Sequence, residues 1–260
     1  MNVMAPHVPV GARAAVEISG IRKTFRSARG AIEALPEPNL TVSPGQFLSI
    51  VGPSGCGKST LLSLIAGLDR PTAGRIRIDG QEVDGPHESL GVVFQRDLLL
   101  DWRSVLDNVL LQVEMRGLPP AKYADAAREL LAMVGLQDFH SRYPRELSGG
   151  MRQRVGIARA LVTEPEVLLM DEAFSALDVL TGERLREDIL ELWQGGTMPT
   201  QAMLVVSHNI EEAVLMADRV LVFASDPGRI RCQLAIQLPR PRHPDSADVR
   251  ALIDEVYALM

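Results

Sequence analysis

The stretch "GPSGCGKST", residues Gly52 to Thr60, decides the fold of this 260-residue chain. It matches the pattern G-x-x-x-x-G-K-[ST] at every fixed position, and it stands between a short apolar run, "QFLSIVG", and a helical pattern, "KSTLLSLIAGL". A glycine-rich loop between a strand and a helix can curl its backbone N–H groups around phosphate oxygens, and the helix N-terminus adds a favourable dipole. The sequence therefore predicts a phosphate-binding loop here.

Two residues of this loop have predicted roles of their own. Lys58 is expected to reach the β- and γ-phosphates of a nucleotide, and Ser59 is expected to offer its hydroxyl to Mg²⁺. The alternative is an ordinary glycine turn before a helix, which the agreement of motif and context disfavours. Cys56 occupies a variable position and is not expected to be a catalytic thiol. The other residues predicted to contact the nucleotide are Gly52, Pro53, Ser54, Gly55, Cys56, Gly57 and Thr60.

Composition and charge exclude several classes of protein. The net charge of −6 and the pI of about 5.5 argue against a nucleic-acid-binding protein and against a polybasic membrane-surface protein. Two cysteines, Cys56 and Cys232, make no disulfide framework, so a reducing cytosol is expected. No apolar run approaches the roughly 18 residues of a membrane span, and the first residues lack the pattern of a signal peptide. The chain is expected to be cytoplasmic and to reach a membrane through another chain.

Strand and helix patterns alternate along the chain, which predicts an α/β protein with a mostly parallel sheet and helices on its faces. One domain is expected over residues 14–260, after a flexible tail at residues 1–13. Within it, residues 97–160 are predicted as an inserted helical lobe, and residues 238–260 as an extended connector with a short last helix. A tight turn at Asp226-Pro227-Gly228 is expected between two strands. The other predicted strands are residues 14–25, 46–52, 75–80, 90–95, 166–172 and 202–208, and the clearest predicted helices are residues 122–136 and 175–193.

Polar residues follow several of the predicted strands, at the edge where ligands bind in open parallel sheets. Asp171 is expected to hold a hydrated Mg²⁺, and Glu172 to polarise the attacking water. Alone, two acids at a strand end would more simply face solvent. Gln95 can ligate Mg²⁺ or orient water, and His208 closes another strand, although surface and structural roles compete for each. Phe25 is expected to stack on adenine, with burial in the core as the alternative.

A second glycine-containing helix start, "LSGGMRQR", follows at residues 147–154. One small ligand does not need two such helix starts on the same side. Ser148, Gly149 and Gly150 would make sense if they face a nucleotide held by Lys58 of another copy, in a two-fold, head-to-tail dimer. The alternative is a plain serine N-cap worth about 1 kcal/mol, with residues 152–154 on a solvated helix face.

The ordered series of Gly52–Ser59, Gln95, "LSGGMRQR", Asp171-Glu172, "SALD" at residues 175–178 and His208 resembles the ATP-binding cassette (ABC) ATPases. The resemblance implies a P-loop NTPase of ABC type, with an antiparallel β region and an inserted helical subdomain beside the mostly parallel sheet. It implies ATP as substrate and Mg²⁺ held by Ser59, Gln95 and Asp171. By the same resemblance Gln95 is the Q-loop glutamine, Glu172 the catalytic glutamate, Asp178 the D-loop aspartate and His208 the switch histidine. Phe25 takes the place of the adenine-stacking aromatic residue.

Segments such as "FSALDVLTGERL", "SHNIEEAV" and "DPGRI" are similar to importer ATPases of the nitrate, sulfonate and taurine group, except that Asn209 stands where aspartate is common. This implies an ATPase subunit that acts as a homodimer on the inner face of the cell membrane. There it would dock on a separate permease and serve a solute-binding protein indirectly. The alternatives are a soluble ABC ATPase with a non-transport role, an importer ATPase for another solute or lipid, a small-molecule kinase and a non-catalytic binding module. "LSGGMRQR" and "SALD" have no role in a kinase.

The segment "DLLLDWR", residues 97–103, begins two residues after Gln95 and is apolar for its place near a polar site. It is expected either to pack into the core of the helical lobe or to line a groove for a short permease helix, with Trp102 as the interface anchor.

Overall fold

The structure is a computed structural model that describes residues 14–27, 30–36, 38–195, 199–224 and 228–260. The chain forms two compact units, of which the first combines residues Met1–His87 with Gln201–Met260 and the second is Glu88–Thr200. The predicted tail at residues 1–13 and the Asp226-Pro227 part of the predicted turn lie outside the described residues.

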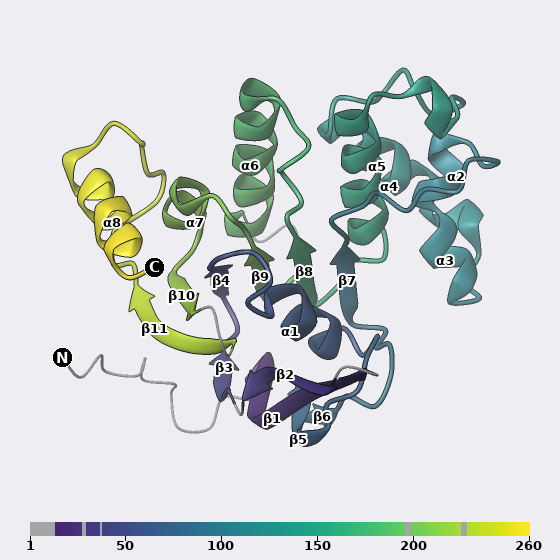
Figure 1. The fold of residues 1–260 in the computed structure, drawn as a ribbon. Coiled ribbons are helices and arrows are strands. Elements are labelled where there is room, and N and C mark those ends of the chain that lie inside the picture. The colour runs from purple at the N-terminus through teal and green to yellow at the C-terminus, as the bar shows by residue number, and fades with distance from the viewer. Residues whose placement is uncertain (1–13, 28–29, 37, 196–198, 225–227) are drawn as a thin grey trace. The chain divides into compact units, whose positions relative to one another are not determined.

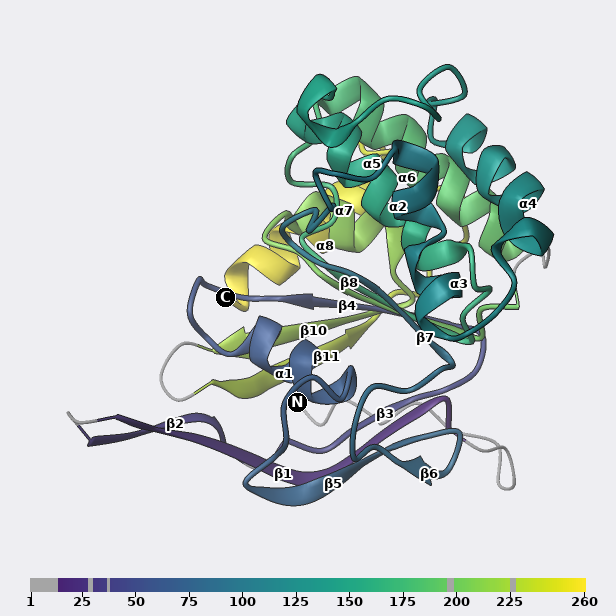
Figure 2. The same ribbon diagram turned by 90° about the vertical axis from the view of Figure 1, so that its right-hand side faces the viewer.

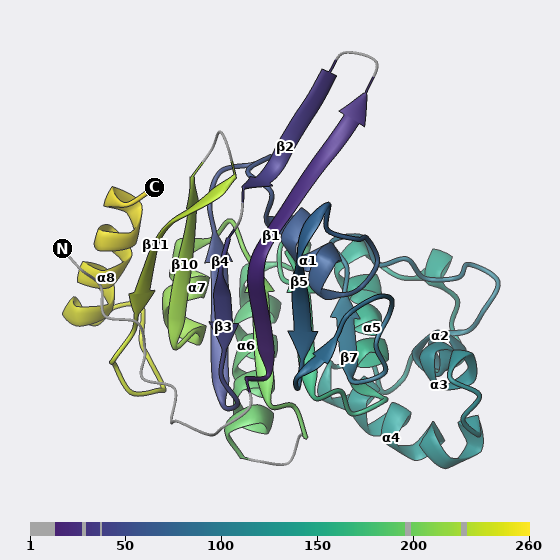
Figure 3. The ribbon, with the colours of Figure 1, turned by 90° about the horizontal axis from the view of Figure 1, so that it is seen from below.

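The first unit contains an antiparallel sheet built around one long strand, β1. This strand pairs antiparallel with β2, β3 and β5, and β6 pairs with β5. Val16 and Ile18 of β1 are buried while Glu17 between them is half-exposed, as expected for a sheet with one covered face. The β1–β2 hairpin extends beyond the other strands of this sheet (Figures 2 and 3). The bounds are β1 Val16–Ser27, β2 Gly30–Pro36, β3 Leu40–Val42, β5 Ala73–Ile78 and β6 Gln81–Glu82.

The first unit also contains a largely parallel set of strands in the order β11-β10-β4-β9. Strands β10, β4 and β9 run parallel, and β11 is antiparallel to β10. All residues of β9 are buried, because a parallel sheet is covered on both faces and its strands are continuously apolar. Helices α1, α7 and α8 belong to the same unit. The bounds are β4 Gln46–Val51, β9 Ala202–Val206, β10 Arg219–Ala224, β11 Arg229–Ala235, α1 Lys58–Ile65, α7 Ile210–Met216 and α8 Ala247–Ala258.

Two arginines of the C-terminal connector hold the carboxyl end of α7. Nε of Arg240 donates to the carbonyl oxygen of Met216 at 2.9 Å, and Nη1 of Arg242 donates to those of Val214 and Ala217 at 2.7 and 2.6 Å. Cations at this end of a helix also complement its dipole. Burial lowers the pKa of Arg242 to about 10. The predicted last helix is confirmed as α8, which packs beside α7 (Figure 1).

The second unit joins two parallel strands, β7 and β8, to a group of helices. Helix α5 packs against β7, α2 and α4 with a continuous run of buried residues from Val155 to Leu161. The predicted helical pattern begins later than residue 97, because the first helix starts at Val105, after the N-cap Ser104. The bounds are β7 Leu90–Val93, β8 Val167–Asp171, α2 Val105–Val109, α3 Leu111–Met115, α4 Pro120–Met133, the 3-10 helix Pro144–Glu146, α5 Gly149–Leu161 and α6 Val179–Gln194.

Candidate nucleotide site

The predicted phosphate-binding loop joins β4 to α1, and a glycine at its end is required by close packing. Gly57 is the N-cap residue of α1 and has a φ of 97°, in the region that favours glycine. A Cβ atom added there would lie 2.8 Å from the carbonyl oxygen of Ala34 and 3.1 Å from Cδ2 of Leu35, both on β2. A larger residue would therefore displace β2 or the loop.

Lys58, the first residue of α1, directs its ammonium group back into the loop. Its side chain is buried, and Nζ donates to the carbonyl oxygens of Gly52 and Pro53 at 2.8 and 2.9 Å. Nζ also lies 3.8 Å from Sγ of the buried Cys56. Phosphate oxygens are charged acceptors and bind a cation more strongly than neutral carbonyls do. The lysine is therefore placed to exchange loop carbonyls for phosphate oxygens.

The remaining loop residues present a mixture of exposed backbone and hydroxyl groups. Ser54, Gly55 and Ser59 are exposed, and Thr60 is half-exposed. The hydroxyl of Ser59 at the start of a helix is a hard oxygen donor of the kind that suits Mg²⁺. These positions agree with the predicted loop, and their contacts with a nucleotide remain a prediction.

Phe25 lies on the β1–β2 hairpin, opposite Ile32 in the register of the two strands. Its side chain is 45% exposed, so the alternative that it packs in the core is wrong. Nζ of Lys23 lies 5.0 Å from the centroid of the ring. A ring face that is open to solvent can stack on a base.

His208 is exposed between the carboxyl end of β9 and the start of α7, as the sequence predicts. The next residue, Asn209, is the N-cap of α7, and its Oδ1 accepts from the backbone N–H of Glu212 at 3.2 Å. Asparagine and aspartate cap helices about equally well. Asn209 in place of the common aspartate therefore leaves this helix start intact.

In the second unit the structure brings Gln95 and Glu172 together. They follow the parallel strands β7 and β8, and Nε2 of Gln95 donates to Oε2 of Glu172 at 3.0 Å. This bond uses the amide nitrogen of Gln95, so its amide oxygen can serve as a hard ligand for Mg²⁺. The carboxylate of Asp171, the last residue of β8, is a ligand of the same kind.

The backbone of Glu172 has an unusual conformation. Its φ of 49° lies in the left-handed region, which non-glycine residues rarely adopt. Two bonds hold it there, because the backbone N–H and the hydroxyl of Ser175 donate to the carbonyl oxygen of Glu172 at 3.1 and 2.8 Å. Strained residues held by their surroundings are concentrated at functional sites, which favours a functional role for Glu172.

Ser148 is the N-cap of α5, and its Oγ accepts from the backbone N–H of Met151 at 3.2 Å. The capping role is thus confirmed, and contact with a nucleotide remains a prediction. Gly149 and Gly150 begin the helix, and a Cβ atom on Gly150 would lie 3.3 Å from the carbonyl oxygen of Ala176. The "LSGG" and "SALD" stretches are therefore neighbours within this unit.

Asp178, at the end of "SALD", is the N-cap of α6. Its Oδ1 accepts from the backbone N–H of Thr181 at 3.0 Å, and hydrogen bonding by Thr181, together with the positive charge of Arg154, lowers the pKa of Asp178. Asp178 is thus ionised at neutral pH, at the favourable end of the helix dipole.

The alternative that residues 152–154 form a solvated helix face is wrong. Gln153 is 2% exposed and donates from Nε2 to the carbonyl oxygen of Phe94 at 3.1 Å, and Nη1 of Arg154 donates to that of Val134 at 2.7 Å. The buried Arg159 was not predicted from the sequence as a residue of the site. A signal existed, because Arg159 lies seven residues after Arg152 and thus on the same helix face, within the apolar run "VGIARAL".

Comparison with known proteins identifies the family. The family model described as "ABC transporter" matches residues 35–175. The chain is 46% identical over 224 residues to a nitrate import ATP-binding protein of Synechocystis sp., covering 86% of this chain and 83% of that protein. It is 44% identical over 239 residues to a taurine import ATP-binding protein of Pseudomonas syringae pv. tomato, covering 92% and 89%.

A solved structure supports the same assignment. It is the dimeric structure of a post-hydrolysis state of an ATP-binding cassette bound to ADP and Pi, with a TM-score of 0.76 and 32% identity, and the match covers 86% of this chain and all of the other. Within the residues that the structure describes, no helix is both long and apolar enough to cross a membrane.

Proposed function

Because this chain belongs to the ABC transporter family, we propose that it is the ATP-hydrolysing subunit of an importer, which powers uptake of a small solute through a separate permease. The solute is of the nitrate, sulfonate or taurine kind, since similar chains are named for nitrate and taurine import. The subunit works at the inner face of the cell membrane, held there by the permease, and a solute-binding protein acts on it indirectly.

The observation that carries this proposal is the hydrogen bond between Gln95 and Glu172, which follow the neighbouring parallel strands β7 and β8. This bond joins the proposed amide ligand to the proposed carboxylate base, and Glu172 directly follows Asp171 in the sequence. A small-molecule kinase has no use for the second helix start at Ser148, and the presence of Glu172 in its strained conformation counts against a non-catalytic binding module. Hydrolysis of ATP uses each of these groups.

In the proposed reaction, two copies of the chain hold two ATP molecules between them in a head-to-tail dimer. Lys58 binds the β- and γ-phosphates of one ATP, and Ser148, Gly149 and Gly150 of the other copy contact the same γ-phosphate. Glu172 accepts a proton from the attacking water and His208 stabilises the developing charge. Nucleotide binds the closed dimer better than the open one, so ATP binding closes it and hydrolysis reopens it.

The oxygen donors of the chain fit Mg²⁺, which neutralises charge on the phosphates when it is bound. Ser59 offers a hydroxyl, Gln95 an amide oxygen and Asp171 a carboxylate, all of them hard ligands. Magnesium keeps several waters and shares its ligands with substrate phosphates, so three protein donors are enough for this role.

The permease is proposed to dock on the exposed apolar residues of the segment that follows Gln95. Trp102 is 75% exposed and Leu98 is 53% exposed, so packing of these two residues in the core is excluded. Exposed tryptophan is a favoured anchor at protein interfaces.

Uptake by cells tests the importer. Deletion of this gene should abolish growth on taurine or nitrate as the sole source of sulfur or nitrogen, and uptake of the labelled solute should return with the parent gene but not with Lys58→Ala. Unchanged uptake of both solutes in the deletion strain, with ATPase activity confirmed for the purified chain, would contradict the proposed solute class and leave the ATPase assignment standing.

Mixed dimers test the head-to-tail arrangement. Lys58→Ala and Ser148→Arg chains should each be inactive alone, whereas mixing them restores one intact composite site and part of the ATPase activity. Loss of ATP binding by the isolated Ser148→Arg monomer would show that Ser148 acts within its own chain.

A further inference from the structure

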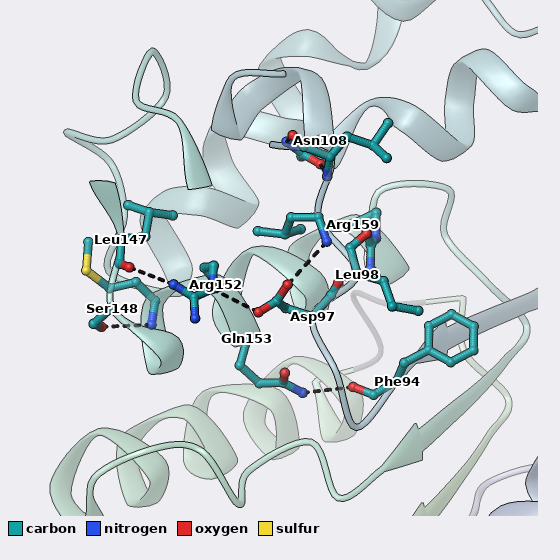
Figure 4. Close-up of polar contacts among 12 residues, drawn as sticks. Phe94, Asp97, Leu98, Asn108, Leu147, Ser148, Arg152, Gln153 and Arg159 are labelled. Atoms are coloured by element: carbon teal, nitrogen blue, oxygen red, sulfur yellow. Dashed lines mark hydrogen bonds and ion pairs between the residues drawn. The ribbon is translucent and has the colours of Figure 1, made fainter. Parts of the chain in front are cut away.

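The loop that contains Gln95 is held mainly by side chains. Residues 94–104, all described by the structure, join β7 to α2 without helix or strand, so their backbone groups need other partners. Gln153 binds the carbonyl oxygen of Phe94, and Arg159 binds those of Asp97 and Leu98. These donors belong to α5, the helix that begins at Gly149 (Figure 4).

Arg159 anchors the middle of the loop. It is 6% exposed, and its Nη2 and Nη1 donate to the carbonyl oxygens of Asp97 and Leu98 at 2.6 and 2.9 Å. Leu98 has a φ of 48°, a conformation that non-glycine residues rarely adopt. Arginine keeps its charge even when buried, so the two carbonyls receive charged donors that hold Leu98 in this conformation while its side chain stays exposed.

Arg152 connects the loop to the start of α5. Its Nε donates to Oδ2 of Asp97 at 2.9 Å, and its Nη1 donates to the carbonyl oxygen of Leu147 at 2.9 Å. Leu147 directly precedes Ser148. One guanidinium group therefore spans the loop two residues after Gln95 and the chain one residue before Ser148 (Figure 4).

The far end of the loop is fixed by α2. Asn108 is fully buried, and its Oδ1 accepts from the backbone N–H of Leu100 at 2.8 Å while its Nδ2 donates to the carbonyl oxygens of Leu100 and Arg103 at 3.1 Å. Trp102 lies within this bonded turn. The exposed Trp102 thus belongs to a turn whose backbone is held by the side chain of Asn108.

We infer that Arg152 and Arg159 are positioning residues that join loop 94–104 to α5, Arg152 near its first turn and Arg159 at its last, so that displacement of the loop at Leu98 or Trp102 also displaces Ser148. The effect on ATP rests on the proposed function, in which Ser148 contacts the ATP of the other copy. The alternative is that these bonds only stabilise the fold.

Hydrogen exchange on the isolated chain tests the mechanical link without any nucleotide. Asp97→Asn is nearly isosteric and removes the charge that Arg152 binds. Exchange should become about tenfold faster at the amides of Met151 and Arg152, the loss expected for one charged hydrogen bond, and Asp97→Glu should restore much of the protection. Glu114→Gln is the matched control, because Glu114 pairs with Arg103 of the same loop at 2.7 Å but not with α5. Glu114→Gln should leave the hydrogen-exchange rates at the amides of Met151 and Arg152 unchanged.

A fluorine signal from Trp102 tests whether ATP acts through the link. The chain has two tryptophans, and Trp102→Phe assigns the resonance of Trp102 in 5-fluorotryptophan-labelled protein. In a Glu172→Gln background, which retains ATP, addition of ATP should shift this resonance. The shift should be lost in Asp97→Asn and in Arg152→Gln. The double variant should lose no more of the ATP-induced shift than either single variant does.

Two results would overturn the inference. The first is parental exchange at Met151 in Asp97→Asn, which would show that the loop does not hold the start of α5. The second is an ATP-induced Trp102 shift of parental size in both single variants, which would show that ATP reaches Trp102 by another route. Failure of the chain to dimerise with ATP would contradict the proposed sandwich, and the exchange experiment would still decide the link.

Discussion

Ser148→Ala separates two roles that one hydroxyl group can have. In the structure Oγ of Ser148 accepts from the backbone N–H of Met151 at 3.2 Å and caps α5. Loss of such a cap costs about 1 kcal/mol, which in a domain of this size lowers Tm by roughly 2–4 °C. If capping were the whole role, the variant would lose this much stability and keep its ATPase activity.

The proposed contact with ATP adds a second loss that is measured differently. A hydrogen bond to a charged group contributes about 1.5–3 kcal/mol, and each 1.36 kcal/mol of barrier is a factor of ten in rate. Ser148→Ala should therefore lower the ATPase rate of the dimer about 10- to 100-fold, while ATP still binds to the isolated monomer through Lys58. The assays are thermal unfolding, nucleotide binding and steady-state hydrolysis at saturating ATP.

Ser246→Ala provides the matched control, because Ser246 caps α8 in the same way and accepts from the backbone N–H of Val249 at 3.3 Å. It should show a similar loss of Tm with parental hydrolysis. If Ser148→Ala and Ser246→Ala behave alike in both assays, Ser148 is only a cap and the reasoning that places it on the partner's ATP is refuted.

Four further changes test other residues of the site. Glu172→Gln should keep ATP affinity and lower turnover about 10²-fold or more, as expected for a positioned general base; turnover at the parent rate would assign the base elsewhere. His208→Ala should slow turnover with little effect on ATP binding, and an unchanged rate would make this histidine structural. Trp102→Ala should leave Tm and isolated ATPase activity unchanged, since the side chain is 75% exposed, and should weaken co-purification with the permease by about 2 kcal/mol; early melting would instead show a role in folding. Gly57→Ala should lose nucleotide binding and about 1–2 kcal/mol of stability from left-handed strain alone, with more from the contact at Ala34, as measured by denaturant unfolding; full stability would contradict the packing argument.

The local patterns of the sequence predicted the elements of the site well. The apolar run before Gly52, the glycines of the loop and the polar residues at strand ends are short-range signals, and the structure has β4, α1, β7 and β8 where they indicate. Asn209 is another short-range signal, because helix capping depends on the side-chain chemistry of a residue at the helix start.

The contacts of loop 94–104 could not be predicted, because they join residues far apart in the sequence. Gln153 binds a backbone group 59 residues earlier, and hydrophobic periodicity carries no information on such pairs. The pattern also extended the helical lobe back to residue 97. The run of leucines there is typical of a helix. In the structure, however, backbone carbonyl oxygens of this segment accept hydrogen bonds from the side chains of Arg159 and Asn108.

The chemistry of the two helix starts differs in a way that answers why one chain has both. Gly57 has no side chain with which to cap α1, so the first N–H groups of that helix suit phosphate oxygens as their acceptors. Ser148 caps α5 by accepting a bond from Met151, and a hydroxyl that accepts still has a proton to donate. The first helix start can thus hold a triphosphate through its backbone, whereas the second satisfies the N–H of Met151 with its own cap and offers the Ser148 hydroxyl together with the first backbone N–H groups of α5. We expect a helix start of the second kind to bind a phosphate that is already held by another copy of the chain, and to contribute only when the two copies close.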